Sequence, residues 1–226
     1  MQKSLIPGLV GLLIGAVIGF WGANALNRNT TAANPAANFT LSNANGQGGS
    51  LSNSGGALSP EVAETLAASE REPENFVVQM KTGDLYAQIG RFEEAIGFYK
   101  RGLALKPDDK QVHLVIANAY FDAGQFENAG DHYSKVLELE PTNISARTDL
   151  ATTYVQRANP DYDRAVKEFE ASLAVDPKHE PTIYNLGIAL QKKGDAEGAK
   201  KMLERLESVN PSSELVTKLR QALLPQ

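Results

Sequence analysis

Apolar and polar residues follow a helical period along most of the chain after residue 59. Within residues 81–107, apolar residues recur every three to four positions in two stretches that Gly90 separates. Gly124 and Gly194 separate similar stretches further along the chain. Glycine often ends a helix because it adopts the left-handed backbone conformation without steric cost. The pattern therefore predicts pairs of helices joined by short turns.

The helix-pair pattern returns at a nearly constant interval. Its prolines recur at a spacing of about 34 residues, and columns of small and large residues keep the same register. In chain order the columns are Pro107, Pro141, Pro177 and Pro211; Gly83, Ala117, Ala151 and Gly187; Tyr86, Tyr120, Tyr154 and Leu190; Ala95, Ala129, Ala165 and Ala199; and Tyr99, Tyr133, Phe169 and Leu203. Self-similarity at such a period predicts a solenoid of stacked helix pairs.

The residue types in these columns fit the packing of two helices. Gly83 and Ala95 allow the helices to approach closely, and Tyr99 fills the space beside them. Pro107 stops the second helix, and the Asp108-Asp109 pair can cap the next one.

This order of small and large positions with a terminal proline resembles the tetratricopeptide repeat (TPR) over residues 74–211. The resemblance implies an all-α, right-handed solenoid of four units, at residues 76–109, 110–143, 144–179 and 180–213. The third unit carries two extra residues at 157–160, so we expect its turn to bulge. The tryptophan position of the family is also changed throughout, to Gln79, His113, Arg147 and Ile183.

Both ends of the repeat array carry a further predicted helix. A helix start at residues 59–61 predicts a capping half-repeat over residues 59–73. Leu215, Leu219 and Leu223 recur every four residues within 212–226, which predicts an amphipathic cap on the last unit.

The N-terminus has a different pattern, because residues 5–26 contain no charge. A stretch of that length can cross the hydrocarbon core of a bilayer as a helix. Trp21 lies where an interfacial aromatic residue is expected. Lys3 precedes the stretch and Arg28 follows it, so the charge bias is small and favours a cytoplasmic N-terminus. We predict that residues 1–27 anchor the chain once in a bacterial inner membrane, with the C-terminal domain on the periplasmic side.

Cleavage as a signal peptide is the alternative, because Ala23 and Ala25 form a small-x-small site. The product would be a soluble secreted or periplasmic adaptor. If the segment stays, Gly11, Gly15 and Gly19 share one helix face and allow self-association in the membrane. Residues 28–58, rich in Asn, Gly and Ser, predict a flexible linker between anchor and repeats.

Charge and composition exclude several classes of function. The chain carries a net charge of −5, to which Lys3 and Arg28 contribute two positive charges, so the body that follows the linker carries −7. Such an acidic body repels nucleic acid. The absence of cysteine excludes thiolate chemistry and disulfides.

No catalytic or cofactor constellation stands out in the sequence. His113, His132 and His179 show no metal-ligand spacing, and we predict separate surface positions for them. The acidic pairs Glu93-Glu94 and Asp161/Asp163 suit the starts of second helices. We therefore expect no enzyme, cofactor or metal, with an enzyme subunit as the remote alternative.

The TPR resemblance implies that the first helix of each unit lines a groove that binds a protein or peptide partner. The residues it places there are Val77, Met80, Asp84, Gln88, Leu114, Asn118, Phe121, Thr148, Thr152, Val155, Tyr184, Ile188 and Gln191. The chaperone-binding branch of the family grips a carboxylate with clustered Lys and Arg, and here Lys81 is the lone candidate. The combined prediction is a membrane-tethered scaffold for complex assembly in the cell envelope.

Overall fold

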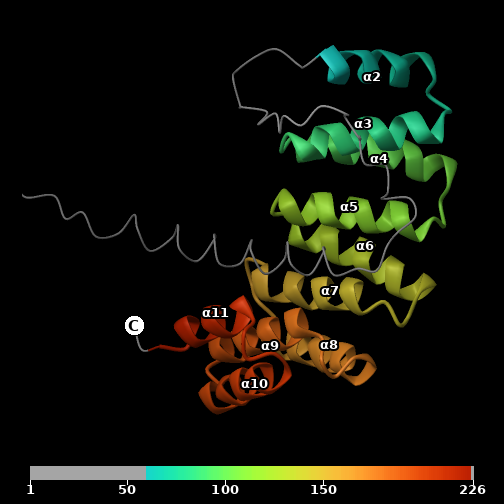
Figure 1. The fold of residues 1–226 in the computed structure, drawn as a ribbon. Helices are drawn as coiled ribbons and strands as arrows, with labels where there is room; N and C mark the ends of the chain where they lie inside the picture. The colour runs from blue at the N-terminus through green and yellow to red at the C-terminus, as the bar shows by residue number, and fades with distance from the viewer. Residues whose placement is uncertain (1–59, 225–226) are drawn as a thin grey trace, which may run out of the picture. The chain divides into compact units, whose positions relative to one another are not determined.

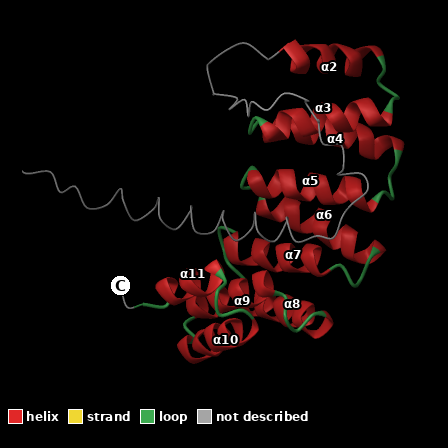
Figure 2. Cartoon of the chain, viewed as in Figure 1, coloured by secondary structure: helices red, strands yellow, loops and turns green. Residues whose placement is uncertain are grey.

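The computed structural model describes residues 60–224, which form ten α-helices and no strand (Figures 1 and 2). In chain order these are α2 (Pro60–Arg71), α3 (Phe76–Gln88), α4 (Phe92–Leu105), α5 (Lys110–Asp122), α6 (Phe126–Leu139), α7 (Ile144–Gln156), α8 (Tyr162–Val175), α9 (Glu180–Lys193), α10 (Ala196–Val209) and α11 (Glu214–Ala222). The predicted all-α fold is confirmed.

The described residues divide into two compact units. The N-terminal unit comprises residues 60–146 and 156–159, with helices α2 to α6. The C-terminal unit comprises residues 147–155 and 160–224, with most of α7 and helices α8 to α11. In the N-terminal unit α3 packs along α4 and α5 along α6, and in the C-terminal unit α9 packs against α8, α10 and α11.

Polar side chains cap the N-termini of several helices. The side-chain oxygens of Asn75, Asp109, Asp161, Asp195 and Ser213 each accept a hydrogen bond from a backbone N–H of the following first turn. These N–H groups lack a partner within the helix, so each cap stabilises a helix start by about 1 kcal/mol. The caps at Asp109 and Asp161 agree with the sequence-based prediction.

An equivalent backbone hydrogen bond closes the turns inside the helix pairs. The N–H of Arg91 donates to the carbonyl of Tyr86 at 2.9 Å, and in the next unit Gln125 donates to Tyr120 at 2.8 Å. Gly90 makes this sharp reversal with a φ of 75°. In the third unit the N–H of Asp161 donates to the carbonyl of Tyr154 at 3.0 Å, seven residues earlier instead of five. The two extra residues therefore lengthen the loop while the closing bond is kept.

Small residues lie where helices approach each other. A Cβ atom added to Gly83 would lie 2.5 Å from the ring of Tyr99. Ala95, in the second helix of the same pair, is fully buried. Tyr133 and Phe169, which share the large column with Tyr99, are fully buried as well. The repeat columns are thus the contacts between helices.

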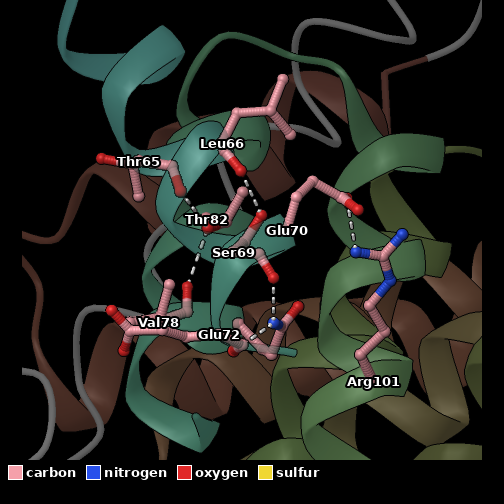
Figure 3. Close-up of polar contacts among 9 residues, drawn as sticks. Thr65, Leu66, Ser69, Glu70, Glu72, Val78, Thr82 and Arg101 are labelled. Atoms are coloured by element: carbon pink, nitrogen blue, oxygen red, sulfur yellow. Dashed lines mark hydrogen bonds and ion pairs between the residues drawn. The ribbon is translucent and has the colours of Figure 1, made fainter. Parts of the chain in front are cut away.

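Helix α2 packs on α3, and polar contacts join it to α3 and α4 (Figure 3). The side-chain amide of Gln79 donates to the carbonyls of Ser69 at 3.0 Å and Glu72 at 3.3 Å. An ion pair of 2.8 Å joins Arg101 on α4 to Glu70 on α2. Gln79, at the tryptophan position of the family, thereby satisfies carbonyls near the C-terminus of the preceding helix.

None of the helices within residues 60–224 is long and apolar enough to cross a membrane. The predicted anchor, its cleavage site, the glycine stripe and the linker fall within residues 1–58, outside the described residues. These assignments, and the proposed domain boundaries, stay predictions.

Candidate peptide-binding surface

On α3, the predicted groove residues keep a surface that a partner can reach. Val77, Met80, Asp84 and Gln88 follow each other at three- and four-residue steps, so they share one helix face. Val77 is 69% exposed, Asp84 and Gln88 are exposed, and Met80 is half-buried. This face therefore combines apolar area with a carboxylate and an amide.

Val77 also borders an open cavity. The cavity, of about 720 Å³, lies beside the loop that joins α2 to α3. Its apolar wall includes Phe76, and the ammonium of Lys106 lies 3.9 Å from the centroid of the Phe76 ring. An apolar side chain of a partner could bind in this cavity, next to the exposed face of α3.

On α5, the corresponding face is more enclosed. Leu114 and Asn118 are half-buried. Phe121 is only 6% exposed, and its ring meets that of Phe126 edge to face with 5.2 Å between the centroids. Phe121 therefore packs within the N-terminal unit and offers little surface to a partner.

Two tyrosine hydroxyls orient the polar groups of this surface. The hydroxyl of Tyr99 donates to Oδ1 of Asp84 at 2.7 Å, and that of Tyr133 donates to Oδ1 of Asn118 at 2.7 Å. The second oxygen of Asp84 remains an acceptor and the NH₂ group of Asn118 remains a donor. The sequence prediction had treated both tyrosines only as core residues. A shared signal was present, because each tyrosine follows its polar partner at the same spacing along the chain.

Burial raises the pKa values of both groups in the Asp84–Tyr99 pair. Partial burial raises the pKa of the Asp84 carboxyl, and the hydrogen bond from Tyr99 lowers it in part. Burial raises the pKa of the Tyr99 hydroxyl well above its usual range, and the negative charge of Asp84 raises it further. Tyr99 therefore stays protonated and donates to Asp84 at any physiological pH.

In the C-terminal unit, most of the predicted groove residues are buried. Thr148, Thr152, Val155 and Tyr184 are all less than 9% exposed, Ile188 is half-buried and Gln191 is exposed. The hydroxyls of Thr148 and Thr182 lie 2.6 Å apart, and Thr152 donates to the carbonyl of Thr148 at 2.8 Å. These hydroxyls form their hydrogen bonds inside the unit, so this part of the predicted groove exposes little polar surface. The groove assignment here stays a prediction.

The prediction that the histidines are separate surface residues is wrong. His113 is only 7% exposed and its Nδ1 lies 3.0 Å from Nδ1 of His132. Nε2 of His113 lies 3.0 Å from the carbonyl of Pro107, which can only accept. Nε2 therefore carries a proton, and in the neutral pair Nδ1 of His113 accepts from Nδ1 of His132. His179 is half-buried, with Nδ1 at 2.6 Å from the hydroxyl of Thr182.

The environment of the pair disfavours a charge on His132. Burial, together with the nearby His113 and Lys100, lowers the pKa of His132 to about 4, and Asp131 opposes this shift. The neighbouring repeats indicated such a contact, because Arg147 and Glu168 occupy the matching positions and form an ion pair of 2.8 Å. Within residues 60–224, no group of three or more such side chains is arranged to hold a metal ion.

The helix pairs and their repeat columns define an α-solenoid. A model described as "Tetratricopeptide repeat" matches residues 157–223, and one described as "TPR repeat" matches residues 83–122 and 117–157. The chain belongs to the tetratricopeptide-repeat family. It is a scaffold for protein interactions, and members of this family are typically not enzymes.

Solved structures show the same fold at low sequence identity. A TPR protein from Parabacteroides merdae has a TM-score of 0.64 and 22% identity, with 72% of this chain and 64% of that chain covered. MamA from Desulfovibrio magneticus has a TM-score of 0.61 and 15% identity, covering 68% and 85%. The TPR protein TTC0263 from Thermus thermophilus has a TM-score of 0.54 and 17% identity, covering 65% and 80%. No curated protein sequence matches this chain.

Proposed function

We propose that this protein is a membrane-tethered TPR scaffold that binds an extended segment of a partner protein in the cell envelope during assembly of a complex. The supporting observation is the matched pair of polar groups on α3 and α5. Asp84 and Asn118 lie one repeat apart, and each is oriented by a tyrosine hydroxyl at 2.7 Å while keeping free hydrogen-bonding capacity.

An extended peptide is complementary to this arrangement. Its backbone carries donors and acceptors at regular intervals, which the Asn118 amide and the Asp84 carboxylate can bind. Because the tyrosines already hold both side chains, little rotamer entropy is lost on binding. Val77 and Met80 supply apolar contact area beside these polar groups.

Peptides selected from a random display library against the full chain in mild detergent would test this surface. Asn118→Ala should weaken binding of the selected peptides roughly 10- to 100-fold, on the scale of an interface hot spot. Asn128→Ala is the matched control, because Asn128 is an exposed amide on α6 that bonds only to Gln125. Equal affinity of the two variants would exclude α5 as the binding surface.

A separate experiment tests the membrane anchor. The charge-free stretch at residues 5–26 supports an uncleaved anchor. We expect the protein to remain in the membrane fraction after alkaline carbonate extraction, with a mature mass of 24.3 kDa. A soluble product that begins near residue 26 would instead establish the alternative of a cleaved, exported adaptor.

A further inference from the structure

We infer that the partner segment carries a lysine or arginine side chain, and that Asp84 binds this cation and sets the specificity of the surface. The inference rests on the proposed function, because it assigns a chemistry to the segment bound by α3 and α5.

Among residues 60–224, Asp84 is an oriented carboxylate without a cation. Oδ1 accepts the hydroxyl proton of Tyr99 at 2.7 Å, which leaves Oδ2 as a free acceptor. Lys81, one turn away on α3, is exposed and forms no ion pair with it in this part of the chain. Two other partly enclosed carboxylates do have cations, since Glu168 pairs with Arg147 and Glu140 pairs with Lys110. Asp84 is thus under-compensated in the free protein.

The missing cation matters because the Asp84 carboxyl is partly desolvated. Its neighbours remove part of its hydration, which is why the pKa of Asp84 is raised. A lysine or arginine of a partner would replace the lost water with a charge-assisted hydrogen bond, which is about twice as strong as a neutral one. Because Asp84 is exposed, an incoming side chain can reach it without rearrangement of the helix.

The next repeat provides the contrast that makes this a specificity determinant. Asn118 occupies the position of Asp84 in that repeat and accepts from Tyr133 at the same 2.7 Å. The geometry is the same in the two repeats and the charge is different. A neutral amide is suited to a peptide carbonyl, whereas the carboxylate favours a cation. The surface therefore selects a segment with a basic residue on the α3 side.

The chain itself supplies the variant for the test. Asp84→Asn places the residue type of Asn118 at the matching position, where Tyr99 can still donate to Oδ1. Asp108→Asn is the control, because it changes the net charge equally in an exposed loop. Short random peptides would be selected by display against the full-length wild-type chain in mild detergent. A selected peptide and its copy with norleucine in place of the basic residue would then be compared by fluorescence anisotropy.

We expect lysine or arginine to be enriched at one position of the selected peptides. The wild-type chain and Asp108→Asn should prefer the basic peptide by about tenfold or more, as for a charge-assisted hydrogen bond. Asp84→Asn should reduce this preference to within about twofold, by weakening the basic peptide more than the norleucine peptide. Added salt should weaken the preference in the wild-type chain, because the contact is exposed.

Other outcomes separate the two proposals. Peptides that need Asn118 but show no basic enrichment, or that keep their preference on Asp84→Asn, would overturn the role of Asp84 and leave the proposed function standing. Peptides that bind Asn118→Ala and Asp84→Asn as tightly as they bind the wild-type chain would overturn both proposals. Failure to recover any peptide that depends on α3 or α5 would count against both as well.

Discussion

The N-terminal and C-terminal units use the same repeat positions for different chemistry. In the N-terminal unit, Tyr133 lies behind Asn118 and donates to it. The matching residues of the third repeat are Phe169 and Thr152, which are both buried. Phenylalanine fills the same space without a hydroxyl, so Thr152 donates instead to the carbonyl of Thr148 within its own helix.

The polar groups of the two units therefore face different surroundings. The N-terminal unit holds polar side chains at its surface, where a partner can reach them. The C-terminal unit satisfies its hydroxyls internally, as in the contact of 2.6 Å between Thr148 and Thr182. The repeat fixes the volume that each column must fill, and the hydroxyl of Tyr133, which Phe169 lacks, orients a polar side chain of the first helix.

The largest expected effect is one that the two units share. Tyr133→Ala and Phe169→Ala each remove a fully buried ring, so each should lower the free energy of unfolding by about 3–5 kcal/mol. Urea unfolding followed by circular dichroism measures both losses. Glu127→Ala, at an exposed position of α6, should change stability by less than about 0.5 kcal/mol. A small loss for only one of the ring variants would show that the columns do not pack alike.

The second prediction concerns the pH dependence of the N-terminal unit. The pKa of His132 is lowered from 6.5 to about 4, so between these values the unfolded chain binds a proton that the folded N-terminal unit does not. The contribution of His132 to the free energy of unfolding is therefore fully present above pH 6.5. It is lost as the pH drops toward 4, by about 2–3 kcal/mol for this partly buried group.

Melting curves from pH 7 to 4 would measure that loss. His132→Phe copies Phe98, the residue at the matching position of the preceding repeat, and should flatten the decline. Variants of the C-terminal unit, such as Phe169→Leu, should leave the slope of this decline with pH unchanged. An equally steep decline in His132→Phe would assign the acid sensitivity to other groups.

The third prediction concerns the hydroxyls themselves. Tyr99→Phe and Tyr133→Phe should each cost about 1 kcal/mol, the usual net contribution of one hydrogen bond. Only Tyr99→Phe should also raise the pKa of Asp84, because the lost hydrogen bond favours the ionised carboxyl. A carboxyl-detected NMR titration would measure this shift. An unchanged Asp84 titration would mean that Tyr99 does not hold the carboxylate in solution.

The last prediction concerns a turn that both units share. Gly90 and Gly194 have φ angles of 75° and 91° with open space around the position of a Cβ. Alanine at either position should cost about 1 kcal/mol from backbone strain alone. Gly97→Ala, inside α4 and also in open space, should stabilise by about 0.5–1 kcal/mol. Different costs at Gly90 and Gly194 would contradict a shared turn geometry.

The sequence by itself determined the helix pairs, their order and their local ends. The columns at Gly83, Ala95 and Tyr99 required close packing of two helices, and the Asp109 cap and the Gly90 turn depend on contacts within a few residues. Interactions of such short range are readable from the chain because neighbouring residues make them in any context.

Only the tertiary structure decided which side chains within a column reach the surface. The TPR resemblance assigned Thr152 and Asn118 to one groove, yet Thr152 is buried and Asn118 is held by Tyr133. The prediction of separate surface histidines likewise missed the contact of 3.0 Å between His113 and His132. A helical period fixes the direction of a side chain to within one face, whereas burial depends on what a residue from the adjoining helix places against it.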